Sequence, residues 1–265
     1  KNIGPDANFL QCMKKAQGQF TWLVSDDDIV VKGAVAQIIR FLSANKEMSL
    51  IYVTTRDFRG RYTEIESCSI HKPEAETDIV THDKKTFMKY AGYYWGFMSS
   101  FICNSKRFSK IKNPEKYFGT YWLQSYIHAL CTSKDSVIGV IKDPCVGAGI
   151  YVNTSNFDSA LVNGIYYKKM LDTMIQEVGF DRKQLDRLYI HRLSHLLRHD
   201  IVKEKASGKK RIDKKNLFKS TRSYPEAWLT VYPLMLIPDV ICRIAIGNYR
   251  EKISIEGKIR VNRPE

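Results

Sequence analysis

The chain contains the stretch Phe20-Thr21-Trp22-Leu23-Val24-Ser25-Asp26-Asp27-Asp28, in which an apolar run leads to three consecutive aspartates. An apolar run of this length is typical of a buried strand, so the aspartates lie at the strand's carboxyl end. Helical periodicity flanks the stretch at residues 8–16 and 34–42, and a second strand is predicted at 50–53. This alternation of helices and strands predicts an α/β domain.

Three adjacent carboxylates repel one another unless a cation or hydrogen-bond donors compensate their charge. In an open α/β sheet, ligands bind at the carboxyl ends of the strands. Hard oxygen ligands on a short loop suit Mg²⁺ or Mn²⁺, which can in turn bridge the phosphates of a nucleotide. The alternative is that the triplet only caps the next helix, whose dipole favours negative charge at its start. The triplet by itself does not decide between the two.

The composition narrows the class of protein. Of 265 residues, 44% are hydrophobic and 26% are charged, which excludes a disordered chain, a collagen-like repeat and a small disulfide scaffold. A formal net charge of +14 calls for an anionic partner or surface. The six cysteines are widely spaced, which predicts buried free thiols in a reducing compartment. We expect no membrane span, because the longest apolar stretch, 231–246, contains prolines and charged residues.

The residues before the triplet extend the pattern. They are Asn2-Ile3-Gly4, Asn8, Ala16 and Gly18. Together with the strand and Asp26-Asp27-Asp28, they resemble the family 2 glycosyltransferases of the GT-A fold. The triplet followed by Gly33-Ala34 is similar to the bacterial O-antigen and capsule branch, which includes abequosyltransferase-like enzymes. The resemblance is specific over residues 2–33 and weaker from 49 to 149.

This resemblance implies a GT-A type, Rossmann-like mixed sheet flanked by helices. The catalytic domain would occupy residues 1–150 and lack its N-terminal nucleobase-binding part. Residues 151–265 would form a helical, basic C-terminal region. The implied activity is transfer of a sugar from a nucleotide diphosphate sugar to an acceptor hydroxyl, with inversion at the anomeric carbon and dependence on Mn²⁺ or Mg²⁺.

The resemblance also implies site residues at the start of the chain. Asp26 and Asp28 would hold the metal. Asn2, Gly4, Asn8, Asp26 and Asp27 would bind the nucleotide sugar. For Asp27, contact with the metal and contact with the ribose both remain open.

The general base is less well defined, because the Glu-Asp pair of inverting members is missing from this sequence. Residues 114–122 read Pro-Glu-Lys-Tyr-Phe-Gly-Thr-Tyr-Trp at the corresponding place. Glu115 is the nearest carboxylate and is the candidate general base. The alternative is a solvated glutamate on a loop.

Aromatic residues beside small ones suit the apolar face of a sugar ring. Gly92-Tyr93-Tyr94-Trp95-Gly96 precedes Ser99-Ser100, and Trp122 follows in the next predicted helix. Trp95, Ser99 and Trp122 are therefore acceptor-binding candidates. The alternative is that these aromatic residues belong to the core.

The C-terminal part is strongly basic. Residues 201–265 hold 15 Lys or Arg against 7 Asp or Glu, and they surround an apolar segment containing Trp228 and Tyr232. This pattern fits a segment that lies on an anionic membrane. We expect a protein that is cytoplasmic and peripheral at the inner face of the cell membrane, with a saccharide acceptor carried on a polyprenyl lipid. The alternative is a terminal helix packed on the catalytic domain.

Three other functions remain open. A nucleotidyltransferase also holds metal between paired carboxylates. A non-catalytic basic protein could bind nucleic acid or membranes, although the chain has no recognisable nucleic-acid motif and we expect no nucleic-acid partner. A transferase-like protein without catalysis would account for the missing Glu-Asp pair.

Overall fold

A computed structural model describes residues 2–58, 74–132, 135–149, 158, 160–208 and 212–246. The chain divides into two compact units. Unit 1 comprises Lys1–Ser155 and Met170–Leu185, and unit 2 comprises Asn156–Lys169 and Asp186–Glu265. The predicted boundary near residue 150 lies close to Ser155, where the chain first passes from unit 1 to unit 2. The return of residues 170–185 to unit 1 was not predicted. Most of the predicted loop at 56–78 lies outside the described residues.

Unit 1 is built on a mixed sheet with the strand order β1-β5-β3-β6-β2, and β4 pairs with β6. The strands are β1 (Phe20–Trp22), β2 (Ile29–Val30), β3 (Met48–Phe58), β4 (Ile79–Thr81), β5 (Phe101–Asn104) and β6 (Val137–Gly149). β3 and β6 are parallel, and β5 runs antiparallel to both β1 and β3. The carboxyl ends of β1, β3 and β6 therefore meet at one edge of the sheet, here called the carboxyl edge. The predicted mixed sheet is confirmed.

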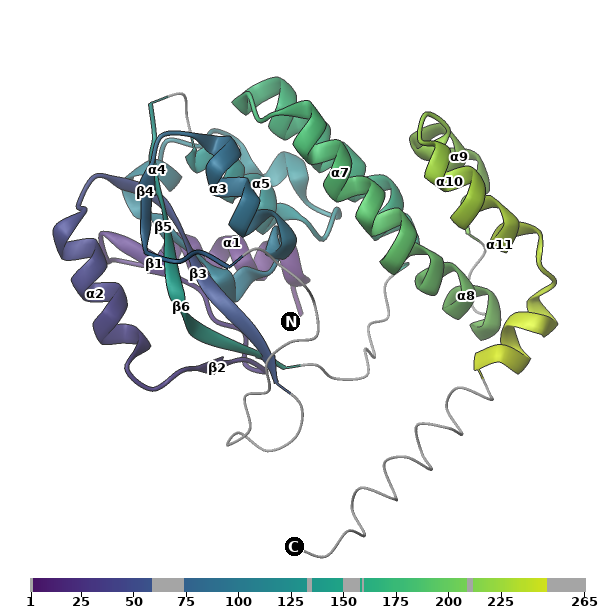
Figure 1. Cartoon of the computed structure of the whole chain (residues 1–265), viewed down its shortest axis with the longest axis horizontal. Helices are drawn as coiled ribbons and strands as arrows, with labels where there is room; N and C mark the ends of the chain where they lie inside the picture. Colours follow the sequence, from purple (N-terminus) through teal and green to yellow (C-terminus); the bar gives the residue numbers. More distant parts are fainter. Residues whose placement is uncertain are drawn as a thin grey trace, which may run out of the picture. The chain divides into compact units, whose positions relative to one another are not determined.

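Helices cover both faces of this sheet (Figure 1). On one face, α2 (Ala34–Ala44) buries Ala34, Ile38 and Phe41, which share a core with Ile51 and Val146. The spacing of the three helical residues places them on one side of the helix. The other face carries α1 (Pro5–Lys15), α3 (Lys84–Ala91) and α5 (Leu123–Cys131). Short helices η1 (Gly92–Tyr94), η2 (Met98–Ser100), α4 (Ser105–Phe108), η3 (Pro114–Tyr117) and η5 (Met174–Val178) complete unit 1.

A bulge in β6 determines where β2 lies. Val53 pairs with Ile141 and Thr55 with Val146, so one residue of β3 lies opposite four residues of β6. Thr54 Oγ1 donates to the Ile141 carbonyl at 2.7 Å. Before the bulge β6 pairs with β4, and after it β6 pairs with β2, the strand that directly follows the aspartates.

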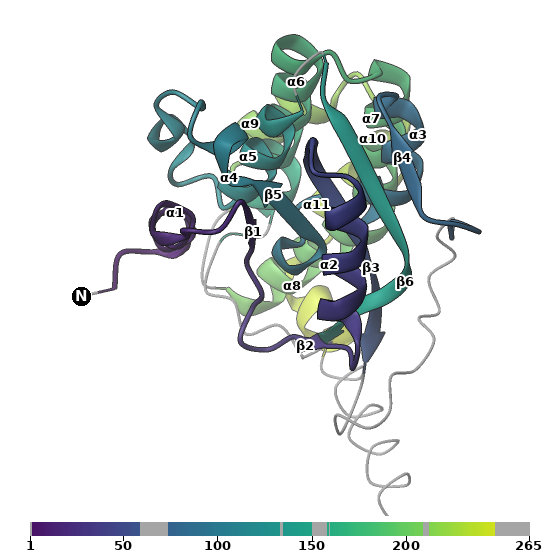
Figure 2. The same cartoon turned by 90° about the vertical axis from the view of Figure 1, so that its left-hand side faces the viewer.

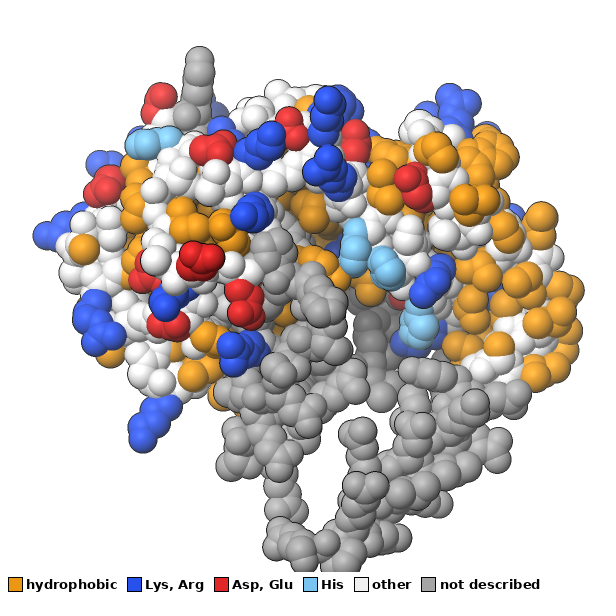
Figure 3. All heavy atoms as spheres, viewed as in Figure 1, with side chains coloured by type: hydrophobic (Ala, Val, Ile, Leu, Met, Phe, Trp, Pro, Cys, Tyr) orange, Lys and Arg blue, Asp and Glu red, His pale blue; other side chains and the backbone are white. Residues whose placement is uncertain are grey.

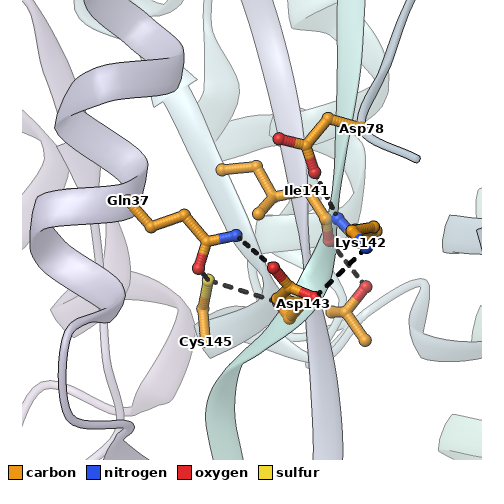
Figure 4. Close-up of polar contacts among 7 residues, drawn as sticks. Gln37, Asp78, Ile141, Lys142, Asp143 and Cys145 are labelled. Carbon is orange, nitrogen blue, oxygen red and sulfur yellow. Dashed lines mark hydrogen bonds and ion pairs between the residues drawn. The ribbon is translucent and has the colours of Figure 1, made fainter. Parts of the chain in front are cut away.

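Side chains from neighbouring elements hold the bulge in place (Figure 4). Asp78 Oδ1 accepts the Lys142 amide at 2.9 Å, and Gln37 Nε2 of α2 donates to Asp143 Oδ2 at 3.3 Å. Burial raises the pKa of the Cys145 thiol to about 12, so this cysteine stays protonated at neutral pH. Side chains of other elements thus satisfy the Lys142 amide and the Ile141 carbonyl, where the pairing with β3 is interrupted.

Unit 2 is helical, as predicted for the C-terminal region. Its elements include η4 (Leu161–Tyr166), η6 (Leu193–Leu197), α8 (Arg198–Ser207), α9 (Lys214–Thr221), α10 (Pro225–Thr230) and α11 (Tyr232–Leu236), and α6 (Tyr167–Thr173) and α7 (Arg182–Arg192) contribute one end each. Its core contains Tyr189, whose hydroxyl donates to the Gly164 carbonyl at 2.6 Å. In the described residues no single helix has the length and composition to cross a bilayer, although the pair Pro225–Leu236 and Asp239–Ile246, bent by 99°, meets both criteria together.

Candidate active site

The three aspartates form a turn at the carboxyl edge of the sheet. β1 ends at Trp22, β2 begins at Ile29, and the Asp28 amide donates to the Ser25 carbonyl at 3.3 Å. Figure 2 shows the chain passing from β1 to β2 at the lower end of the sheet. Asp26 and Asp27 are exposed and Asp28 is half-buried. Two carboxylates of this turn, here called the acidic turn, therefore face solvent at the edge where ligands bind in α/β folds.

Ser99, in the short helix η2 just before β5, holds the acidic turn. Its hydroxyl donates to Asp28 Oδ2 at 2.5 Å and accepts the Ser25 amide at 2.9 Å. Its carbonyl accepts the Trp22 indole N–H at 2.8 Å. Ser99 is fully buried, so its predicted contact with an acceptor is corrected: this side chain orients the carboxylate of Asp28.

The start of the chain forms a tight turn that opens α1. Asn2 Oδ1 accepts the Gly4 amide at 2.9 Å, and Gly4 adopts a positive φ of 82° before the first residue of the helix. Glycine suits this position because a side chain would be strained there. Asn2 and Asn8 are exposed and Gly4 is partly exposed. Their predicted role in nucleotide-sugar binding stays a prediction.

The beginnings of α1 and α5 are tied together by Asp6, a residue that the sequence did not single out. Asp6 is buried, and its Oδ2 accepts the Tyr121 amide at 3.2 Å. Tyr121 has a φ of 61°, an uncommon value for a residue with a side chain. This residue lies two positions before the first residue of α5 and is 38% exposed. Strain of this kind is found at functional sites, and only the three-dimensional structure reveals it here.

The two tryptophans predicted to contact an acceptor are packed in the interior. Trp95 is 1% exposed, and its ring lies 5.2 Å from that of Phe101 and 5.8 Å from that of Phe180. Trp122 is 8% exposed and packs so closely on Gly96 that a Cβ there would lie 2.2 Å from Trp122 Cζ3. The acceptor assignment is therefore corrected for both residues, because neither ring offers a free face to a sugar.

Glu115 lies at the other edge of the sheet. It forms an ion pair with Lys14 at 2.7 Å, and Lys14 is at the C-terminal end of α1, just before β1 begins. The acidic turn follows the end of β1. The hydrogen bond from Lys14 lowers the pKa of Glu115, which makes it a weaker base. The assignment of Glu115 as general base is therefore corrected.

A cation at the carboxyl edge is a further residue that the sequence did not indicate. Arg56 near the end of β3 pairs with Gly147 of β6, and Gly147 pairs with Ile29, the residue after Asp28. Two strand spacings separate Arg56 from Ile29, which is about 10 Å. Arg56 and the acidic turn thus lie at the same edge of the sheet.

No protein-family profile matches the chain. Over 135 residues it is 25% identical to abequosyltransferase RfbV of Salmonella typhimurium, a match that covers 48% of this chain and 39% of that protein. The match thus spans well under half the length of this curated relative.

Solved structures give a longer match. S. aureus TarS 1–349 aligns with 98% of this chain and 72% of its own, with 13% identity and a TM-score of 0.50. The same TarS segment in complex with UDP-GlcNAc aligns with 84% of this chain and 60% of its own, with 11% identity and a TM-score of 0.49. The first of these likenesses supports the fold. The chain is a GT-A-fold protein that resembles the family 2 glycosyltransferases in both sequence and fold.

Proposed function

We propose that this chain is a glycosyltransferase that moves a sugar from a nucleotide diphosphate sugar to an acceptor hydroxyl. The observation that carries the proposal is the acidic turn at the carboxyl edge of a GT-A sheet, beside Arg56. The similarity to an abequosyltransferase supports a sugar as the transferred group. In the proposed reaction the acceptor oxygen attacks the anomeric carbon as the bond to diphosphate breaks. This single displacement inverts the anomeric centre, and the hydroxyl proton leaves to a base.

Mg²⁺ or Mn²⁺ fits the oxygen donors of the acidic turn. Such ions are commonly held by one or two carboxylates and complete their coordination with water and substrate phosphates. Asp26 and Asp28 would hold the ion. Within the described residues no group of three or more His, Cys, Asp or Glu could hold a metal, so the donor's phosphates would have to supply further ligands. When bound, the ion neutralises charge on the leaving diphosphate.

The chain's own residues prepare this edge for the donor. Ser99 fixes the carboxylate of Asp28 through its hydroxyl, so less reorganisation is needed when the donor binds. Arg56 adds a fixed positive charge near the place of the diphosphate. Asp6 holds the backbone of Tyr121 just before α5. We propose that the ring of Tyr121, a partly exposed residue, lies beside the acceptor.

Calorimetric titration with UDP, GDP, CDP and dTDP, with and without Mn²⁺, tests the proposal. We expect one nucleotide to bind, and its binding to require the metal. Incorporation of the nucleotide itself into a product would indicate a nucleotidyltransferase instead. If none of the four binds under either condition, the acidic turn is a structural cap and the proposal fails.

Replacing Ser99 by alanine should weaken this metal-dependent binding without removing it. The change releases Asp28 Oδ2 and leaves the Ser25 amide without its partner. Residues that orient a metal ligand typically contribute about 10- to 100-fold in metal affinity, and we expect a loss in that range. Ser109→Ala is the matched control, because this exposed hydroxyl only donates to the Lys106 carbonyl at 3.1 Å. Equal affinities of the two variants would show that Ser99 does not position Asp28.

We also propose that unit 2 carries the surface that brings the enzyme to an anionic membrane. Trp228, Leu229, Leu236, Val240, Ile241 and Ile244 are each at least 52% exposed, and together they are called the apolar face. In Figure 3 hydrophobic side chains gather over α9, α10 and α11. Exposed apolar side chains that gather in one region commonly mark an interaction surface.

The chemistry around the apolar face favours a bilayer as its partner. Trp228 and Tyr232 pack with Phe218, with ring centroids 4.8 to 5.9 Å apart, and such amphipathic rings are frequent at membrane interfaces. The adjacent helix α9 presents the exposed Lys214, Lys215 and Lys219. Cations beside an apolar surface complement anionic lipid headgroups. This arrangement would place the enzyme where a lipid-linked saccharide acceptor is available.

Sedimentation with vesicles tests the membrane proposal. In low salt we expect binding to vesicles that contain anionic lipid and little binding to neutral vesicles. Leu229→Asp together with Leu236→Asp should lower the partition coefficient about 100-fold, because each leucine loses roughly 1.5 kcal/mol of burial. Val35→Asp with Ile39→Asp is the matched control, since these exposed residues lie on α2 of unit 1. Equal binding to both vesicle types would refute the proposal, and dimerisation through the same face would assign it to a second copy of the chain.

A further inference from the structure

Unit 1 contains a basic pocket that the proposed transfer reaction does not use. Its volume is about 290 Å³, and Arg107, Lys110, Lys112 and Lys116 line it. Ile111 and Leu130 form an apolar part of the wall. A pocket that combines several charges with an apolar wall can orient a small polar ligand.

The basic pocket lies at the opposite edge of the sheet from the acidic turn. Its first lysines follow α4, which begins directly after Asn104, the last residue of β5. Asn104 pairs with Phe20, the first residue of β1, whereas the aspartates follow the last residue of β1. The pocket is therefore separate from the proposed donor site.

The charges of the pocket are only partly balanced. Glu177 is its one carboxylate, and it lies 3.7 Å from Lys116 Nζ and accepts the Tyr117 hydroxyl at 3.4 Å. No ion pair with another described residue involves Lys110 or Lys112, and both are exposed. The two exposed lysines therefore add a positive potential that favours an anion.

The pocket is also held by the fold. The ring of Tyr117 in η3 stacks on that of Tyr126 in α5, with centroids 3.9 Å apart. Lys116 comes from η3, Leu130 from α5 and Glu177 from η5, whereas the other lining residues come from α4 and the segment that follows it. The segment that carries Lys110 and Lys112 thus faces residues of two helices from other parts of the chain.

We propose that the basic pocket binds a phosphate group carried by a saccharide. Lysine ammonium groups bind phosphate as point charges, and several of them match its two negative charges better than the single charge of a carboxylate. The apolar wall of Ile111 and Leu130 suits the carbon face of an attached sugar. The phosphate part of this inference depends on the pocket alone, and the saccharide part rests on the proposed function.

Calorimetric titration in low salt with EDTA tests the inference apart from the metal-dependent donor site. The probes are glucose 1-phosphate, inorganic phosphate and glucose. We expect glucose 1-phosphate to bind more tightly than inorganic phosphate, and glucose not to bind. Lys110→Gln with Lys112→Gln should weaken glucose 1-phosphate binding about tenfold or more, because each charge-assisted hydrogen bond contributes a factor of that order.

Two further variants separate the possible explanations. Lys46→Gln with Lys89→Gln removes the same charge from exposed positions elsewhere in unit 1 and should leave binding unchanged. Asp26→Asn with Asp28→Asn should also leave it unchanged, even if it abolishes nucleotide binding. If both pairs of lysine substitutions weaken glucose 1-phosphate binding equally, the effect is one of net charge and the proposal is overturned. The absence of binding by either phosphate would also overturn it. Equal affinity for the two phosphates would overturn the saccharide part.

Discussion

Replacing both Asp26 and Asp28 by asparagine should lower sugar transfer and metal-dependent nucleotide affinity by at least about 100-fold. The substitution removes the charges that would hold the metal and retains most of the side-chain volume. Groups that stabilise developing charge in an active site typically contribute about 100- to 1,000-fold. Asp26 is exposed, and an asparagine Oδ1 at position 28 can still accept the hydrogen bond from Ser99, so we expect the variant to fold. Calorimetry measures the affinity for the nucleotide that binds, and the initial rate of nucleoside diphosphate release measures sugar transfer.

Glu115→Gln is the matched control for this pair. It removes a carboxylate that is paired with Lys14 at the opposite edge of the sheet. An exposed substitution of this kind changes the free energy of unfolding by about 0.5 kcal/mol or less, so we expect transfer to stay unchanged. A loss of transfer as large as that of the aspartate variant would instead return Glu115 to the role of general base. Unchanged transfer in the aspartate variant, with intact folding, would refute the metal site.

Replacing Trp95 by alanine should lower the free energy of unfolding by about 3 to 5 kcal/mol. The indole is 1% exposed and packs against Phe87, Phe101 and Phe180, so its removal leaves a cavity in the core of unit 1. Domains of this kind are stable by only about 5 to 15 kcal/mol, so the variant loses a large part of its stability. Urea denaturation measures the change. Trp228→Ala is the control, since this tryptophan is 53% exposed and should lose less than about 1 kcal/mol.

The more conservative change Trp95→Phe separates packing from acceptor binding. Within the described part of the chain, no group accepts a hydrogen bond from the buried indole nitrogen. Phenylalanine therefore loses volume but no polar contact, and we expect the KM for the acceptor to stay the same. A raised KM with unchanged stability would restore Trp95 as an acceptor-binding residue.

Local patterns in the sequence predicted the elements of unit 1 well. The apolar period of residues 34–42 predicted a helix, and α2 occupies Ala34–Ala44. The helix buries Ala34, Ile38 and Phe41, whereas the apolar Val35 and Ile39 are exposed. The apolar run that ends at the aspartates is a strand followed by a turn at the carboxyl edge. The bulge of β6 was not predicted, because it depends on pairing with two different strands.

Long-range packing decided which residues surround the acidic turn. Ser99 reaches Asp28 across 71 positions of sequence because β5 lies beside β1 in the sheet. The distance in sequence from the aspartates to Glu115 matched the family pattern for the general base. Glu115 instead forms an ion pair with Lys14 at the opposite edge of the sheet. The glycine and serine residues near Trp95 suggested a ring that binds a sugar. The indole is buried instead, because burying its large apolar surface stabilises the fold.

The amino-acid sequence alone was sufficient to identify the α/β class, the acidic turn and the basic, apolar C-terminal region. Each of these depends on residues close together in the chain, where hydrophobic period and charge act directly. The neighbours of the aspartates, the strained Tyr121 and the basic pocket emerged only from the tertiary structure. They bring together residues from separate elements, and strand order and packing are set by the whole core.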